Sequence, residues 1–161
     1  RTGHPYYLAP YIWAIGGGVA PKRIGNNFCP LAVKLTLEVD RGLPIIFTSP
    51  SHPEESVVID ENTDVLISFN RTICGELTWA NPFYIDSPPT YPLVLVGRAV
   101  PLTLEATRFR IKKDENSYEL YSIKNVDGVL QHYNLVNHRD TENNFNRLGL
   151  SREESPLPFV I

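Results

Sequence analysis

The sequence contains no apolar run approaching the twenty or so residues that a membrane-spanning helix needs. Its amino terminus lacks a basic stretch followed by an apolar one, which is the pattern of a secretory signal peptide. The formal net charge is -3 and no block of like charge stands out, so the chain offers no electrostatic footprint for nucleic acid or an anionic membrane surface. We therefore expect a mature, soluble protein with neither nucleic acid nor membrane as a partner.

Motifs for catalysis and cofactor binding are also missing. No Gly-x-Ser-x-Gly elbow occurs. No Lys-Ser or Lys-Thr pair follows the glycines at 16–18, which therefore predict a tight turn or a close backbone approach rather than a phosphate loop. The four histidines lack the spacing of metal ligands: His4, His52, His132 and His138. We expect no enzyme activity, no cofactor and no bound metal.

Only two cysteines are present, Cys29 and Cys74. They are too few for a zinc site of their own and are not spaced as a redox pair, so a single disulfide is their natural use, with two buried free thiols as the alternative. Asn70 begins an Asn-Arg-Thr sequon, an N-glycosylation acceptor that has meaning only in a secreted protein. Together these features favour the secretory pathway, where a Cys29–Cys74 disulfide would contribute about 4 kcal/mol.

The secondary-structure signal is almost entirely strand, because short apolar runs recur between clusters of Pro, Gly, Asn, Asp and Ser. Residues 107–112 place Phe109 and Ile111 on one face and three basic side chains on the other, as a half-buried strand does. Residues 11–15 and 57–59 are further candidate strands. With about a dozen strands and no linker, we expect one all-β domain over residues 1–161. Periodicity alone leaves a sandwich, a barrel and a trefoil open.

Between residues 5 and 121 the chain carries, in order, PYYLAPYIWAIGGGV, NNFCPLAVKL, DRGLPIIFTSP, DVLISF and TRFRIKKDENSYEL, and it ends in SPLPFVI. These segments resemble the Kunitz family of plant protease inhibitors of the soybean trypsin inhibitor type. The resemblance implies a β-trefoil of about twelve strands in three pseudo-repeats, a disulfide between Cys29 and Cys74, and a reactive loop just after IIFTSP. It also implies a secreted or vacuolar plant protein of the seed with a defence role.

The sequence departs from the family at three places. It begins at Arg1, where family members usually carry a further segment, and no cysteine follows Cys74 to form the family's second disulfide. The third departure is the expected reactive loop itself, which consists of Ser49, Pro50, Ser51, His52, Pro53, Glu54 and Glu55. The residue that enters a protease's primary pocket falls near Ser51 or His52, and residues 53–56 look like an insertion.

This loop is badly suited to trypsin. Trypsin's pocket carries an aspartate and needs Lys or Arg, yet no basic residue lies between Arg41 and Arg71. Pro53 lacks the N–H that an extended, protease-bound chain uses. Glu54 and Glu55 add carboxylates that face the aspartate of the pocket. We predict weak or no trypsin inhibition through this loop.

Several alternatives stay open. The loop also fits an ordinary solvated hairpin connection that its prolines stiffen. One reading is a monomeric Kunitz-type inhibitor whose target is either a protease of uncertain class or α-amylase. Another is a storage or defence protein of the same fold without an inhibitory loop. A trefoil lectin is the third reading, with Trp13 and Trp79 as sugar platforms, although a tryptophan in a strand is more often core. The basic residues Arg108, Arg110 and Lys112 are interpreted as the solvated face of a strand.

Overall fold

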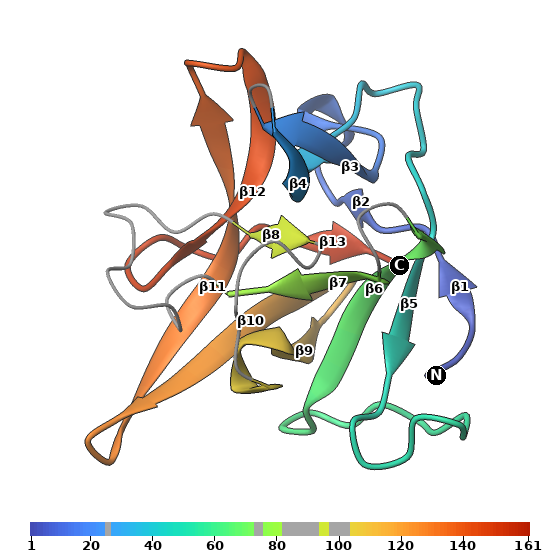
Figure 1. Cartoon of the computed structure of the whole chain (residues 1–161), viewed down its shortest axis with the longest axis vertical. Helices are drawn as coiled ribbons and strands as arrows, with labels where there is room; N and C mark the ends of the chain where they lie inside the picture. The colour runs from blue at the N-terminus through green and yellow to red at the C-terminus, as the bar shows by residue number, and fades with distance from the viewer. Residues whose placement is uncertain (25–26, 73–75, 82–93, 97–103) are drawn as a thin grey trace.

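The computed structural model describes residues 1–24, 27–72, 76–81, 94–96 and 104–161. Regular structure in that part of the chain is almost entirely β (Figure 1). Its strands are β1 (Pro5–Tyr6), β2 (Ala9–Pro10), β3 (Val19–Ile24), β4 (Asn27–Leu35), β5 (Ile45–Thr48), β6 (Val65–Thr72), β7 (Glu76–Ala80), β8 (Leu95–Val96), β9 (Arg108–Asp114), β10 (Ser117–Val126), β11 (Val129–Asp140), β12 (Phe145–Ser151) and β13 (Phe159–Val160). Two 3-10 turns, η1 (Trp13–Ile15) and η3 (Leu104–Thr107), accompany them. Among the described residues no helix has the length and apolar character that crossing a bilayer requires.

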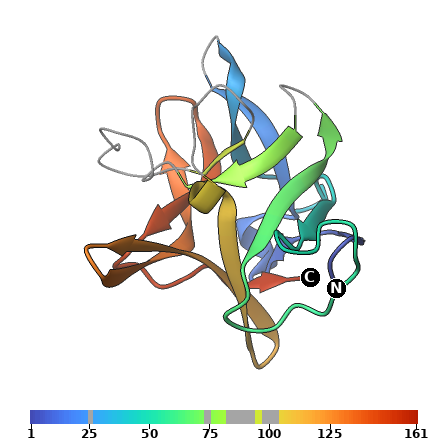
Figure 2. The same ribbon diagram turned by 60° about the horizontal axis from the view of Figure 1, so that its bottom comes forward.

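Strands that follow one another in the chain pair mainly as antiparallel hairpins. The strands from β9 to β12 form three consecutive hairpins, and β5 pairs with β6 in another. Distant pairs join these hairpins, because β6 contacts β9 through Val65 and Phe109, and β4 contacts β12 through Lys34 and Arg147. The strands are therefore arranged around a shared core (Figure 2).

Local sequence explains the sharpest of these hairpin turns. Val126 of β10 pairs with Val129 of β11, so only Asp127 and Gly128 connect the strands. Both connecting residues have positive φ, 52° and 84°, which is the geometry of a type I′ turn and the reason for an Asp-Gly pair there. The Asn125 side chain accepts a hydrogen bond of 2.9 Å from the Gly128 N–H and fixes the turn.

The core consists of the inward-facing residues of alternating strands. Phe109 and Ile111 of β9 are buried while Lys112 is exposed, as the alternation predicted. Trp79 of β7 is fully buried with its ring 5.5 Å from that of Phe69. Burial of each such large apolar side chain stabilises the fold by about 2–3 kcal/mol. The largest fully buried side chains are Trp79, Phe47, Phe109, Phe159, Leu8, Ile45, Ile67, Leu120, Leu135, Leu148 and Leu150.

Two segments that were predicted as strands are not strands. Residues 11–15 contain η1 instead, because the Ile15 N–H bonds back to the Ile12 carbonyl at 3.0 Å and tightens the chain into a turn. Residues 57–59 have no ladder partner, since the Val57 main chain bonds to Thr2 rather than to a neighbouring strand. Apolar runs of this length cannot reveal on their own which partner satisfies their backbone groups.

The glycines at 16–18 form the close backbone approach that the sequence predicted. A Cβ atom on Gly17 would lie 2.3 Å from the Asp40 carbonyl oxygen, and one on Gly18 would lie 1.9 Å from that of Arg41. The Gly17 N–H donates to the Leu37 carbonyl at 3.2 Å, and the Thr36 N–H donates to the Gly18 carbonyl at 3.0 Å. Only glycine leaves room for the loop at 36–42 to pack this closely.

Candidate functional site

The expected reactive loop lies in the connection between β5 and β6, residues 49–64. Register pairs Phe47 with Ile67 and Thr48 with Leu66, so both ends of the connection leave a rigid hairpin. Figures 1 and 2 show this connection at one end of the molecule, beside the amino terminus. All six side chains from residue 51 to residue 56 are exposed. The loop is therefore accessible and stands on a rigid scaffold, which is where binding residues usually lie.

Internal hydrogen bonds shape the tip of the loop. Ser49 is only 5% exposed, and its hydroxyl oxygen accepts a hydrogen bond of 3.2 Å from the His52 N–H. The Glu55 N–H donates to the His52 carbonyl at 3.1 Å, so residues 52–55 form a β-turn. Pro53 occupies the second position of this turn, where its fixed φ is favourable. The backbone at residues 53 and 54 is consequently turned and not extended.

Thr2 anchors the loop from beneath, and we call this set of contacts the Thr2 clamp. Its hydroxyl donates to the Glu55 carbonyl at 3.1 Å and accepts from the Val57 N–H at 2.8 Å. Its main-chain N–H donates to the Val57 carbonyl at 2.9 Å, and its carbonyl accepts from the Ser56 hydroxyl at 3.0 Å. Thr2 is 1% exposed, so these bonds are shielded from water. One buried residue thereby holds three consecutive loop residues, Glu55 and Val57 by their backbone and Ser56 by its side chain.

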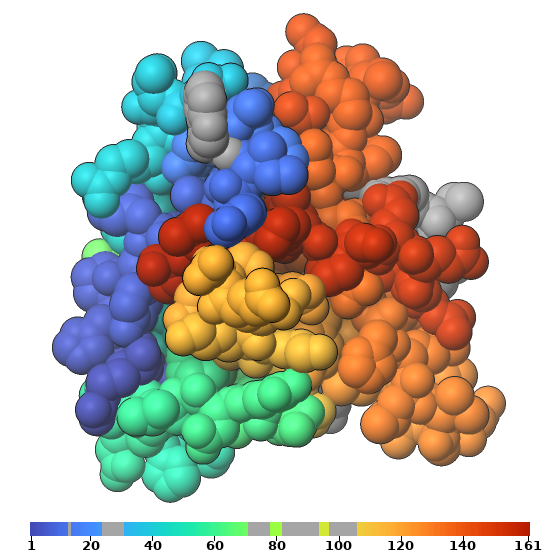
Figure 3. Space-filling model, turned by 180° about the vertical axis from the view of Figure 1, so that it is seen from behind, coloured from blue at the N-terminus to red at the C-terminus, as the bar shows by residue number. Residues whose placement is uncertain are grey.

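The residues on either side of Thr2 extend the contact. The Arg1 guanidinium donates to the Ser56 carbonyl at 3.2 Å, and the Gly3 N–H donates to the Phe47 carbonyl of β5 at 2.9 Å. The amino-terminal segment therefore joins the loop to the strand that precedes it. Figure 3 shows the dark blue amino-terminal residues lying against the teal and green residues of this region.

The far end of the loop is held by an ionic contact. Asp64 Oδ1 accepts a hydrogen bond of 3.0 Å from Arg110 Nε, and Asp64 Oδ2 lies 3.7 Å from Arg108 Nη1. These side chains are between 27% and 41% exposed, so each pair contributes at most about 1 kcal/mol. The basic face of β9 is thus only partly solvated, and two of its arginines position the end of the loop.

The remaining predicted site residues have different outcomes. Asn70 is exposed on β6, where a glycan would have room, but the Thr72 side chain of the sequon lies outside the description. Cys74 and the side chain of Cys29 also lie outside it, so their disulfide stays a prediction. Trp79 is a core residue and not a sugar platform, whereas the Trp13 side chain is outside the described set. No group of three potential metal ligands occurs within the described residues.

Sequence reasoning did not find the Thr2 clamp. A threonine beside a glycine carries no signal of its own, and its partners lie more than fifty positions away in the chain. The approach of the amino-terminal residues to the loop is a tertiary contact between segments that are distant in the chain.

Comparison with known proteins identifies the family. The family model of the legume Kunitz proteins, described as trypsin and protease inhibitor, matches residues 1–161. The chain belongs to this Kunitz family. The chymotrypsin inhibitor ECI of Erythrina variegata is 27% identical over 100% of this chain and 89% of the relative. The Kunitz-type elastase inhibitor BrEI of Bauhinia rufa is 38% identical over 42% of this chain, and the match spans only 47% of that relative's length.

Solved structures establish the fold. A Kunitz type trypsin inhibitor from Cicer arietinum has a TM-score of 0.77 at 24% identity, over 99% of this chain and 90% of that chain. The water-soluble chlorophyll protein of Brassica oleracea, solved with chlorophyll-b, has a TM-score of 0.76 at 22% identity, over 99% of this chain and 89% of that chain. The protein is an all-β β-trefoil, which confirms the fold that the resemblance implied.

Proposed function

We propose that this Kunitz protein is a plant protease inhibitor that acts through residues 49–55 and that inhibits trypsin weakly or not at all. The observation that carries the proposal is the Thr2 clamp, which fixes the loop backbone while leaving the side chains at 51–56 exposed. A loop that is already ordered loses less conformational entropy when it binds, and this preorganisation is what gives such a loop its affinity.

Trypsin is disfavoured by charge and by backbone shape together. The loop has no basic side chain to pair with the aspartate of trypsin's pocket, and Glu54 and Glu55 are both exposed at the surface that would face it. The turn closed by the Glu55 N–H and the His52 carbonyl also prevents residues 53 and 54 from lying extended in a protease cleft. Contact with a protease is therefore confined to the arm before the turn.

On the arm before the turn, residues 49–51, Ser51 is exposed and has a small side chain. It therefore suits a protease with a small primary pocket. Elastase has such a pocket, whereas chymotrypsin has a hydrophobic slot. The name of the Bauhinia rufa relative describes an elastase inhibitor, which supports the same class of target. We propose an elastase-like serine protease as the target.

The test is a titration of elastase, chymotrypsin, trypsin, subtilisin and papain with the purified protein and with Ser51→Lys and His52→Lys. We expect the wild type to inhibit elastase with a dissociation constant well below 1 μM and to leave trypsin active at 10 μM inhibitor. These two concentrations are roughly the limits between a specific and a negligible interaction. Ser51→Lys should lose elastase inhibition and gain trypsin inhibition, because it places an ammonium where trypsin's aspartate needs one.

Ser155→Lys is the matched control, since Ser155 is exposed and lies outside the loop. It should behave as the wild type against all five proteases. If the wild type inhibits none of them and neither lysine variant gains trypsin inhibition, the loop is not a reactive loop and the proposal is wrong.

A storage or defence protein without inhibitory activity is the second candidate. The turn at residues 52–55 favours it, because a turned tip is a poor substrate mimic. A chlorophyll-binding protein of the same fold is also among the structural neighbours.

For either candidate we propose a monomer in the secretory pathway or vacuole of the seed, with a Cys29–Cys74 disulfide and a glycan on Asn70. The relatives named above are plant proteins, which supports this setting. Intact mass measured before and after reduction and deglycosylation checks both modifications.

A further inference from the structure

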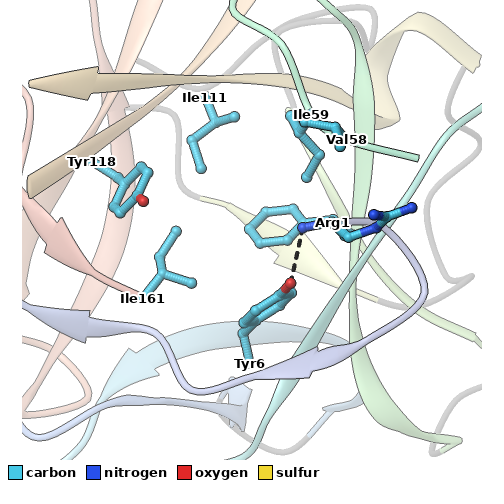
Figure 4. A pocket seen from close by; sticks show the side chains of 8 residues that line it. Arg1, Tyr6, Val58, Ile59, Ile111, Tyr118 and Ile161 are labelled. Atoms are coloured by element: carbon cyan, nitrogen blue, oxygen red, sulfur yellow. Dashed lines mark hydrogen bonds between the residues drawn. The ribbon is translucent and has the colours of Figure 1, made fainter. Parts of the chain in front are cut away.

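A cavity of about 240 Å³ is lined by Val58 and Ile59, the loop residues that directly follow Val57 of the Thr2 clamp. Residues from distant parts of the chain line it: Arg1, Tyr6, Phe47, Val58, Ile59, Ile111, Tyr118 and Ile161. Figure 4 shows most of these side chains around a common space, from which the Arg1 side chain extends outward, and the Arg1 main-chain nitrogen is hydrogen-bonded to the Tyr6 hydroxyl at 2.8 Å. The cavity is separate from the outer surface of the loop, where a protease would bind.

Most of the residues that line the cavity are apolar or aromatic. Phe47 of β5 and Ile111 of β9 are 1% and 9% exposed and form its inner side, and Ile59 and Ile161 are half-buried around it. Side chains that border an empty space lose the dispersion contacts that a filled core would supply. The apolar side chains of this lining favour contact with an apolar guest.

Polar groups are confined to the rim. The Tyr6 hydroxyl is paired with Arg1, and the Tyr118 hydroxyl has no hydrogen-bond partner within the described part of the chain. The Arg1 guanidinium contacts only neutral oxygens of Ser56, and no described carboxylate pairs with it. An apolar interior with a few convergent polar groups is the usual composition of a small-molecule site.

The size of the cavity limits the ligand. A cavity of about 150 Å³ holds benzene, so 240 Å³ accommodates two fused rings. The Arg1 guanidinium has no carboxylate partner among the described residues and favours an anionic substituent, because a carboxylate there would gain a charge-assisted hydrogen bond. We propose that this cavity binds a small aromatic carboxylate, with its rings between Phe47, Ile59 and Ile111 and its carboxylate at Arg1.

Such a ligand would also act on the loop. Val58 and Ile59 line the cavity directly after Val57, and Val57 is held by Thr2, which adjoins Arg1. A ligand that contacts Ile59 and Arg1 therefore bridges the two segments that the Thr2 clamp joins. Because it binds only when these segments are together, it must shift the equilibrium of the loop towards the clamped state.

The test is calorimetric and NMR titration of the whole chain with 2-naphthoate and with the neutral 2-naphthalenemethanol. We expect 2-naphthoate to bind with a dissociation constant between about 0.01 and 1 mM, as its size allows. Ile161→Phe fills the cavity and should weaken binding at least tenfold. Val160→Phe is the matched control, because Val160 is the neighbouring residue but is 44% exposed, and it should bind as the wild type does.

Arg1→Gln separates the two parts of the proposal. It should weaken 2-naphthoate about three- to fivefold, as an exposed ion pair does, and leave the neutral analogue unchanged, whereas Arg152→Gln, at another exposed arginine, should change neither. Saturating 2-naphthoate should also slow cleavage after Glu54 and Glu55 by a glutamate-specific protease in the wild type but not in Ile161→Phe.

These measurements do not depend on inhibitory activity. The proposal is wrong if 2-naphthoate does not bind at 1 mM, a concentration that about 4 kcal/mol of binding free energy would saturate by half. It is equally wrong if Ile161→Phe and Val160→Phe weaken binding to the same extent. If Ile161→Phe does not fold, Ile59→Phe fills the same cavity from the loop side and provides the same comparison.

Discussion

Replacing Thr2 by valine removes the side-chain half of the Thr2 clamp while keeping nearly the same shape at a site that is 1% exposed. Two hydrogen bonds are lost, the one donated to the Glu55 carbonyl and the one accepted from the Val57 N–H. Each contributes about 1 kcal/mol net, so the clamped state should lose about 2 kcal/mol relative to a locally open loop. This corresponds to a roughly thirtyfold larger open population.

Native-state hydrogen exchange of the Val57 amide measures that population directly, because loop amides exchange through local opening. We expect the Val57 amide of Thr2→Val to exchange about thirtyfold faster, the factor equivalent to 2 kcal/mol, while amides of the β10–β11 hairpin change far less. If the loop inhibits an elastase-like protease as proposed, that inhibition should weaken by a similar factor, since the variant loop must be ordered on binding.

Thr63→Val is the matched control, because Thr63 lies in the same connection but is exposed, and only its main-chain N–H makes a described hydrogen bond. It should leave the Val57 amide unchanged. Unaltered exchange at Val57 in Thr2→Val would refute the clamp. Equal acceleration at Val57 and throughout β10 and β11 would show that Thr2 supports the whole fold and not the loop.

Two further predictions concern the scaffold. Burial alone would raise the pKa of Asp140, but hydrogen bonds from Asn143 and the Arg147 guanidinium at 3.2 Å outweigh it and hold that pKa below its ordinary value. A carboxyl whose pKa is lowered in the folded state stabilises the protein above its unfolded-state pKa, and this stabilisation is lost as the pH falls through the folded-state pKa. Asp140→Asn should therefore lower the free energy of unfolding in urea by about 3 kcal/mol at pH 7, and the difference should shrink steadily below about pH 4. A difference that does not depend on pH would contradict this. Gly17→Ala should destabilise the protein by about 3 kcal/mol and move the NMR signals of residues 36–42, because its Cβ would collide with three carbonyl oxygens. Gly128→Ala, where no atom lies within 4 Å and only the positive φ opposes the change, should move none of those signals.

The strand content was predictable from the sequence because burial enforces a period of two. Phe109 and Ile111 had to face one side for β9 to cover the core, and the structure buries both. Gly17 and Gly18 were likewise predictable as a close approach, since a glycine run without a phosphate-loop context has few other uses. These are local constraints, and a single sequence is enough to show them.

The contacts that define the candidate site were not predictable in the same way. Val57–Ile59 has the composition of a strand, but Thr2 and not a neighbouring strand satisfies its backbone, so it remains a loop arm. The ion pairs of Asp64 with Arg108 and Arg110 depend on β6 lying beside β9, which the alternation of either strand does not reveal. Sequence patterns indicate which face of a strand is buried, whereas pairing between distant segments decides which side chains contact that face.

Anchoring also bears on how this scaffold would tolerate a change in the loop. The entropic cost of closing a loop grows only slowly with length, by about 0.6 kcal/mol for each doubling, so an insertion such as the one predicted at residues 53–56 would threaten the fold very little. It would threaten binding, because each additional flexible residue must be ordered at about 1–2 kcal/mol. The turn between His52 and Glu55 and the bonds from Thr2 to Glu55 and Val57 order these residues in advance. Residues at the tip of the loop can therefore change, and with them the specificity, at little cost to stability, provided that Thr2 keeps its hydroxyl.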